Sequence, residues 1–190
     1  MAGALLARQA AGAALAEDAP ALADAALAMA TRFHRGGKLL AFGDGGSGTD
    51  ASHVAVEFMH PVIVGKPALP ALALSNDPAG TADPAEVFAH QLRHFGDPDD
   101  IALGLSTDGH CRNVRRGLAQ AGDQGLLTVA LVGGDGGAIV TDRVAEHIFV
   151  ARDGDPGVVK EIHVTAYHLL WELVHVLLEQ PAVLGPRVFA

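Results

Sequence analysis

The chain has 190 residues and carries 13 Lys and Arg against 22 Asp and Glu, a formal charge of −9 with histidine neutral. This acidic balance excludes the basic surface with which nucleic-acid-binding proteins hold phosphates. Hydrophobic residues make up 49% and charged residues 18%, a composition that excludes a disordered chain. We expect one globular domain over residues 1–190 with a sizeable core.

Cysteine content and apolar runs indicate the compartment. A single cysteine, Cys111, forms no internal disulfide and no cluster for structural zinc. Arg8 interrupts the first apolar stretch, which argues against a signal peptide. No apolar run approaches the roughly 18 residues of a membrane span. We therefore expect a cytoplasmic protein that binds neither membranes nor nucleic acid.

Residues 1–36 are rich in alanine and leucine and predict a helical segment. Asp18 and Pro20 are suited to end one helix and begin the next. An alanine-rich apolar face needs a partner, so we expect this segment to pack on the core or, as an oligomer interface, on another subunit.

From residue 38 onward, short apolar runs alternate with helix-like stretches, and each run ends in a cluster of Gly, Ser, Asn or Asp. The runs are 39–42, 69–74, 101–105, 126–132 and 147–150. Continuous apolar strands are typical of a parallel sheet covered on both faces. The sequence thus predicts an α/β doubly wound domain, in which ligands bind where strands end and helices begin.

The first such loop spans residues 43–49, and we expect its helix to begin near Asp50. Its glycines let backbone N–H groups approach an anion, Ser47 adds a hydroxyl, and the helix N-terminus adds a partial positive charge. It lacks the lysine of a Walker A loop and fails the dinucleotide fingerprint, G-x-G-x-x-G followed by an acidic residue about 20 positions on. It is either a phosphate-binding loop or a tight turn with a helix cap.

The second loop, residues 105–111, also leaves a strand and enters a helix. Ser106 and Thr107 can hold phosphate oxygens, but they can equally be ordinary caps. Asp108 would repel a phosphate unless a cation, a proton or an outward rotamer intervened. A third glycine cluster, residues 133–137, predicts a sharp turn.

His53 and Glu57 are four residues apart and lie on one face of the helix after the first loop. This spacing suits two ligands of one metal ion, a base and a ligand, or an ordinary surface pair. The choice among these readings depends on whether a further polar group meets them in the fold.

The last helix, expected over about 157–179, is apolar nearly all round, so we expect it in the core or an interface. Polar residues recur on it at steps of three and four and form one stripe: Glu161, Thr165, His168, Glu172 and His175. Buried polar groups need partners, so the stripe is either a network inside an oligomer or a set from which His168 faces the loops. His163 and Tyr167 lie off the stripe, and we expect both to be structural.

Residues 42–57, 105–109 and 161–168 resemble the sugar isomerase (SIS) family and, within it, the bacterial phosphoheptose isomerases. The resemblance covers nearly the whole chain. It implies an αβα sandwich around a five-stranded parallel sheet and a homotetramer with active sites at subunit interfaces. It also implies aldose–ketose isomerisation of sedoheptulose 7-phosphate to D-glycero-D-manno-heptose 7-phosphate through an enediol.

The resemblance assigns roles to residues. It implies Glu57 as the catalytic base, His168 as the partner acid or base, and a zinc ion held by His53, Glu57 and His168. Lys160 stands where the family has a glutamine ligand; because an ammonium group cannot ligate zinc, the ion has three protein ligands and water or is absent. The residues implied to bind the sugar phosphate are Asp44, Gly45, Gly46, Ser47, Ser106, Thr107, Asp108 and Lys160.

Several positions depart from the family pattern: Asp44 and His110 replace Asn, Asp108 and Cys111 replace Ser, and Pro61 replaces Arg. These departures favour an alternative, a non-catalytic SIS protein that binds a sugar phosphate or a protein partner; an SIS enzyme with another substrate is a third hypothesis. Glu57 and His168 favour catalysis, because isomerisation needs a carboxylate base and a second acid or base at the sugar oxygens.

Overall fold

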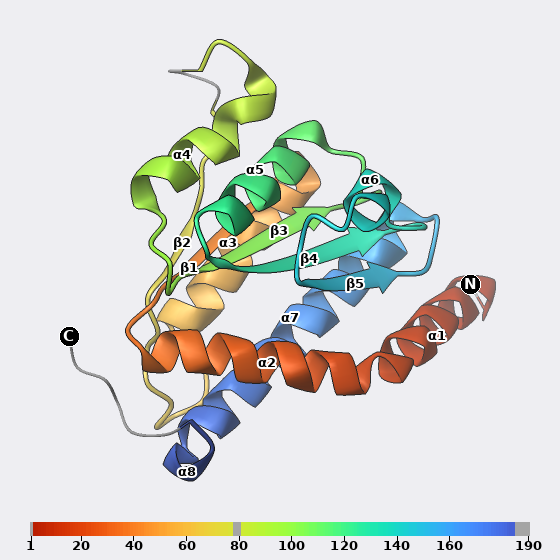
Figure 1. Cartoon of the computed structure of the whole chain (residues 1–190). Coiled ribbons are helices and arrows are strands. Elements are labelled where there is room, and N and C mark those ends of the chain that lie inside the picture. The colour runs from red at the N-terminus through yellow and green to blue at the C-terminus, as the bar shows by residue number, and fades with distance from the viewer. Residues whose placement is uncertain (1, 78–80, 185–190) are drawn as a thin grey trace.

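The computed structural model describes residues 2–77 and 81–184, so the two ends of the expected domain, residues 1 and 190, lie outside it. In this range the chain forms an αβα sandwich around a five-stranded, all-parallel sheet of order β2-β1-β3-β4-β5 (Figure 1). The strands are Leu39–Gly43 (β1), Ala71–Ala73 (β2), Ile101–Ser106 (β3), Leu127–Gly133 (β4) and His147–Ala151 (β5). Each of the expected apolar runs overlaps one strand, and the bounds of the two differ by no more than two residues, which confirms the fold class.

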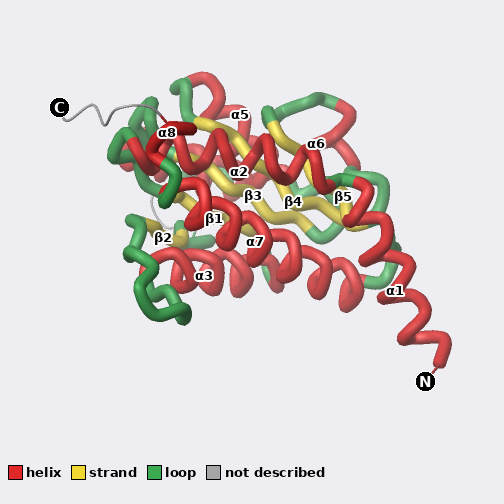
Figure 2. Tube along the Cα trace, turned by 90° about the horizontal axis from the view of Figure 1, so that it is seen from below, coloured by secondary structure: helices red, strands yellow, loops and turns green. Residues whose placement is uncertain are grey.

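Helices cover both faces of the sheet (Figures 1 and 2). One layer holds α1 (Ala2–Glu17), α2 (Ala19–His34), α3 (Gly46–Met59) and α7 (Pro156–Leu178), and the other holds α4 (Val87–Phe95), α5 (Arg112–Asp123) and α6 (Gly137–Thr141). A short 3-10 helix, Pro84–Glu86, precedes α4, and α8 (Pro181–Leu184) follows α7. Because strand residues alternate in direction, Leu39 and Ala41 face the first layer while Leu40 and Phe42 face the second.

The strand order decides where the loops meet. β1 lies beside β3, with Gly43 opposite Leu105, so the loops that follow these two strands are neighbours. In a sheet of this strand order, the chain adds strands on one side of β1 and then on the other, so the order reverses between β1 and β3. Ligands bind at such a point. The two loops that the sequence singled out for phosphate binding therefore share one edge of the sheet.

The N-terminal segment forms two helices that break at Asp18, as expected. The Asp18 carboxylate does not cap α2; it accepts a hydrogen bond from Arg152 at 3.0 Å. The N-terminal part of α1 projects from the molecule (Figures 1 and 2), and Leu5 and Leu6 on it are 64% and 63% exposed. Its use as an oligomer interface stays a prediction.

The helix after the first loop begins earlier than expected, at Gly46 rather than near Asp50. Gly45 has φ +53°, a left-handed conformation that favours glycine and turns the chain from β1 straight into α3. Ser47 therefore lies in the first turn of α3, and its N–H bonds to the Asp44 carbonyl at 3.0 Å.

The third glycine cluster forms the sharp turn that the sequence predicts, between β4 and α6. It also supports the second loop: a Cβ on Gly109 would lie 1.9 Å from the carbonyl oxygen of Gly136. Gly109 itself has φ +72°, which again favours glycine. The two loops thus pack backbone against backbone.

None of the helices in the described part of the chain has the length and hydropathy that crossing a membrane requires.

Candidate active site

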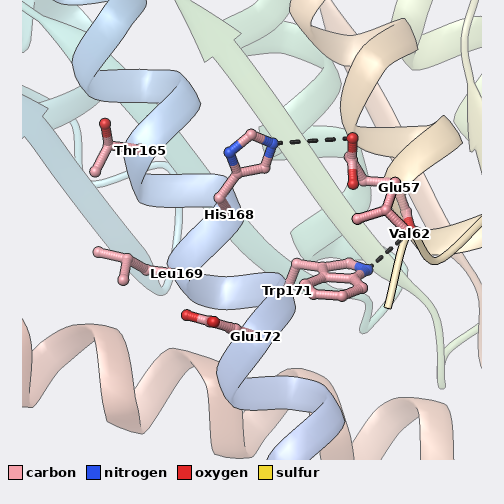
Figure 3. A pocket seen from close by; sticks show the side chains of 7 residues that line it. All are labelled: Glu57, Val62, Thr165, His168, Leu169, Trp171 and Glu172. Atoms are coloured by element: carbon pink, nitrogen blue, oxygen red, sulfur yellow. Dashed lines mark hydrogen bonds and ion pairs between the residues drawn. The ribbon is translucent and has the colours of Figure 1, made fainter. Parts of the chain in front are cut away.

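The structure brings the predicted His53 and Glu57 of α3 together with His168 of α7. The Nε2 atom of His53 lies 3.0 Å from Oε1 of Glu57, and Nε2 of His168 lies 4.0 Å from the same oxygen (Figure 3). One ligand atom from each of these residues lies within 4.8 Å of the others. A carboxylate between two imidazoles can take up a proton, exchange one with a neighbour, or hold a metal ion.

Packing of α3 on α7 fixes this carboxylate. The indole N–H of Trp171, a buried residue of α7, donates to the backbone carbonyl of Glu57 at 2.8 Å. The Glu57 side chain is only 15% exposed, whereas those of His53 and His168 are each 45% exposed. The carboxylate is therefore held against the protein, while both imidazoles remain accessible to a ligand.

A cavity of about 360 Å³ opens beside this cluster. Its lining residues are Glu57, Val62, Thr165, His168, Leu169, Trp171 and Glu172 (Figure 3). The volume lies within the range of small-molecule sites.

The polar stripe of α7 divides among three surroundings. Thr165, His168 and Glu172 line the cavity, but Glu161 pairs with Arg8 of α1, with Nε and Oε2 2.6 Å apart. His175 is fully buried, and its ring nitrogens lie 2.9 Å and 3.1 Å from the carbonyl oxygens of Trp171 and Pro67. Of the two histidines on the stripe, His168 faces the cavity and His175 is structural.

Tyr167, which the sequence assigned to structure alone, contacts the cluster. Its hydroxyl oxygen lies 2.7 Å from Nδ1 of His53, and its ring meets the rings of His53 and His168 edge-on, with centroids 5.6 Å and 5.0 Å apart. Burial, with the negative charges of Asp50 and Glu57, raises the pKa of Tyr167, so the hydroxyl keeps its proton. The sequence could have indicated this contact only through a general rule, that a buried tyrosine O–H needs a hydrogen-bond partner.

A second cavity, of about 390 Å³, lies where the first two loops meet the start of α7. It brings together four of the predicted binding residues, Gly46, Ser47, Thr107 and Lys160. The hydroxyl oxygens of Ser47 and Thr107 are 3.4 Å apart. Two neighbouring hydroxyls and an ammonium group suit an oxyanion.

Lys160 is tied to this second cavity by an ion pair with Asp50, a residue of α3 that is only 5% exposed. The Lys160 ammonium also lies 3.2 Å from Oγ1 of Thr49 and 3.3 Å from the Gly46 carbonyl oxygen. Asp50 also lines this cavity and neutralises part of the Lys160 charge, so Lys160 would act on an anion chiefly as a hydrogen-bond donor.

His163 also lines the second cavity, although it is only 2% exposed. Burial lowers the pKa of His163, against a backbone hydrogen bond at Val132, so the ring is neutral at physiological pH. Its Nε2 atom has no hydrogen-bond partner among the described residues. The structural role expected from the sequence stays a prediction.

The remaining predicted binding residues are engaged within their own loops. Ser106 is buried, and its hydroxyl oxygen accepts the Gly109 N–H at 3.0 Å, while Oδ1 of Asp108 accepts the His110 N–H at 2.9 Å. Asp44 accepts the Gly45 N–H at 2.8 Å and lines a separate cavity. Ser106 and Asp108 thus stabilise the loop itself, and neither caps α5, whose N-cap residue is Cys111.

Comparison with known proteins identifies the family. The SIS domain model matches residues 7–133. The chain belongs to the SIS domain family. This confirms the resemblance seen in the sequence, and α7 with His168 lies beyond the matched range.

Phosphoheptose isomerases are among the relatives of this SIS-domain chain. That of Desulfovibrio desulfuricans is 40% identical over 182 residues, which cover 92% of this chain and 86% of the relative. That of Chlorobaculum tepidum is 42% identical over 154 residues, 77% and 73% of the two chains. The chain is thus an isomerase of the phosphoheptose isomerase type.

Solved structures of this SIS-domain group agree with the fold. The phosphoheptose isomerase from Francisella tularensis has a TM-score of 0.78 at 28% identity and covers 88% of this chain and 94% of its own. The Neisseria gonorrhoeae phosphoheptose isomerase has the same score and identity, with 91% and 93% covered.

Proposed function

We propose that this SIS-domain isomerase interconverts sedoheptulose 7-phosphate and D-glycero-D-manno-heptose 7-phosphate through an enediol. The observation that carries the proposal is the Glu57 carboxylate, held within 4.0 Å of His168 and 3.0 Å of His53 at a cavity. The names of the two relatives described above, both phosphoheptose isomerases, support the substrate class.

The two groups divide the proton transfers. Starting from the ketose, Glu57 takes a proton from C1 while His168 gives one to the C2 carbonyl oxygen, which yields the 1,2-enediol. Glu57 then returns its proton to C2, and His168 takes the proton from the C1 hydroxyl, leaving the aldehyde. Each residue ends in its starting protonation state, so the cycle needs no other reactant.

The cluster fits a zinc ion held by His53, Glu57 and His168. Zinc ligands at about 2.1 Å from a tetrahedral ion are roughly 3.4 Å apart, so atoms that lie within 4.8 Å of one another need only small rotamer changes. Such an ion, when bound, would polarise the substrate oxygens as a Lewis acid. A His168 nitrogen that ligates zinc carries no proton, so His168 would then leave the polarisation of the C2 carbonyl to the ion. Lys160 cannot be a fourth ligand, because its ammonium group pairs with Asp50.

We place the phosphate end of the substrate at the two neighbouring loops. Ser47, Thr107, Lys160 and the backbone of Gly46 would bind it directly. Gly45, whose N–H donates to Asp44, would set the turn of the first loop. Ser106, Asp108 and Asp44 stay in the proposed set as residues that shape these loops through the hydrogen bonds described above.

Lys160→Met tests the phosphate end. We expect KM for the sugar phosphate to rise about tenfold or more, because a hydrogen bond to a charged group contributes about 1.5–3 kcal/mol. Asp50 is left buried without its counter-charge, so stability also falls.

Lys38→Met is the matched control for Lys160→Met. Lys38 pairs with the buried Asp100 at 2.6 Å, far from the loops that would hold phosphate. It should lower the melting temperature and leave KM unchanged. Equal KM values in the two variants would contradict a phosphate-binding role for Lys160.

The proposal includes assembly of residues 1–190, as one cytoplasmic SIS domain, into a homotetramer with active sites at subunit interfaces. Apolar side chains near the cavity support it: Val62 is 77% and Val64 101% exposed in the segment after α3. Such exposed apolar groups mark interaction surfaces.

Light scattering on the purified protein tests the assembly. We expect a mass near four subunits of 19.5 kDa, and a smaller species for Val64→Asp, because a carboxylate cannot be buried there without a partner. Phe95→Asp, at a 54% exposed apolar residue of the opposite layer, should leave the mass unchanged. A monomeric wild type would overturn the assembly.

The isomerase proposal itself is tested by NMR of sedoheptulose 7-phosphate in D₂O, with and without added zinc. Deuterium at the carbon next to the carbonyl reports enediol formation even when net turnover is slow. No incorporation, together with a ligand-induced rise in melting temperature, would favour the non-catalytic sugar-phosphate-binding alternative. The absence of both deuterium incorporation and a rise in melting temperature would point to another substrate.

A further inference from the structure

The hydroxyl of Tyr167 reaches the cluster from the side opposite Glu57. On the His53 ring, Nε2 faces Oε1 of Glu57 at 3.0 Å, and Nδ1 faces the Tyr167 hydroxyl oxygen at 2.7 Å. Both ring nitrogens of His53 are therefore engaged, one by each neighbour. The contact joins α7 to α3, which lie side by side in one layer (Figure 2).

The two contacts limit the protons that the His53 ring can carry. A carboxylate only accepts hydrogen bonds, so Nε2 carries a proton when it faces Glu57. In the neutral ring, Nδ1 is then an acceptor, and the Tyr167 O–H donates to it. If Nε2 instead gives its lone pair to a metal ion, Nδ1 carries the proton and donates to the Tyr167 oxygen. A hydroxyl serves both tautomers because it can donate and accept.

Packing makes Tyr167 a fixed partner while His53 alone would be free to turn. Tyr167 is 1% exposed within the core of its layer, whereas the His53 side chain is 45% exposed. The edge-on contact of the two rings, with centroids 5.6 Å apart, adds a steric limit to the same rotation.

We infer that Tyr167 is a positioning residue of this site: its hydroxyl holds the His53 imidazole in the orientation that presents Nε2 to Glu57 and to a metal ion. The inference rests on the proposed function for its consequence in catalysis, but the contact itself is independent of the substrate. Partners of this kind on the second nitrogen of a histidine ligand typically change metal affinity 10–100-fold.

Tyr167→Phe tests the inference because it removes the hydroxyl and keeps the ring. In the metal-free protein, ¹⁵N NMR of the His53 ring should show the Nδ1 resonance move toward that of a ring nitrogen without a hydrogen bond, because the Tyr167 O–H no longer donates to it. Zinc affinity, measured by competition with a chelator that changes colour, should fall about 10–100-fold. The deuterium-exchange rate should fall with KM unchanged, since Tyr167 does not line the second cavity.

Thr128→Val is the matched control. It also removes a buried hydroxyl that makes one hydrogen bond, to the Glu146 N–H at 2.9 Å, but it lies on β4 away from the cluster. It should lose similar stability and leave the His53 Nδ1 resonance and zinc affinity unchanged. A wild-type Nδ1 resonance and wild-type zinc affinity in folded Tyr167→Phe would overturn the inference. A wild type that exchanges no deuterium would instead count against the proposed function, since the NMR and zinc readouts do not depend on turnover.

Discussion

Glu57→Gln should lower the rate of deuterium exchange into sedoheptulose 7-phosphate by about 10²–10⁴-fold relative to wild type, because an amide cannot take up the C1 proton. The fold should persist: Trp171 donates to the backbone carbonyl of Glu57, and the glutamine side-chain oxygen can still accept from His53. The measurement is the NMR exchange assay, with the melting temperature showing that the variant is folded.

The same substitution at Glu172 tests whether the base has been assigned correctly. Glu172 is the other carboxylate that lines the cavity in the described part of the chain, and it lies on α7 beside His168 (Figure 3). We expect Glu172→Gln to keep most of the exchange activity, because no described contact ties this carboxylate to either imidazole. Exchange retained in Glu57→Gln and lost in Glu172→Gln would move the base to Glu172.

Gly109→Ala should be among the most destabilising single methyl additions in the loops. A left-handed φ of +72° costs an alanine about 1–2 kcal/mol. The new Cβ would also lie 1.9 Å from the Gly136 carbonyl oxygen, so the backbone must shift, at an overpacking cost of about 1–3 kcal/mol. We expect a lower urea midpoint and, because Thr107 and Ser106 belong to the same loop, a higher KM for the sugar phosphate.

Gly134→Ala separates the cost of the left-handed φ from the cost of overpacking. Gly134 has a similar φ of +66°, but a Cβ there meets nothing within 4 Å. It should show the conformational cost alone, so the difference between the variants measures the packing of the third glycine cluster on the second loop. Equal urea midpoints would contradict that packing.

Much of the fold followed from local pattern. Continuous apolar runs predict buried parallel strands, because a strand covered on both faces has no polar side, and each expected run overlaps a strand. The four-residue spacing places His53 and Glu57 on one helix face whatever surrounds that helix, and their nitrogen and oxygen are 3.0 Å apart. Residue type and helix geometry alone were sufficient for that half of the cluster.

The tertiary structure decided how the elements meet, because the faces of a helix do not fix its rotation and axial position against a neighbour. Packing of α7 on α3 brings His168 within 4.0 Å of Glu57 and turns Tyr167, one position earlier, to His53. The same packing joins Lys160 to Asp50, a pairing of residues 110 positions apart that no local pattern encodes. The sequence by itself thus determined the sheet, its loops and the His53–Glu57 pair, and only the packing of the helices completed the site.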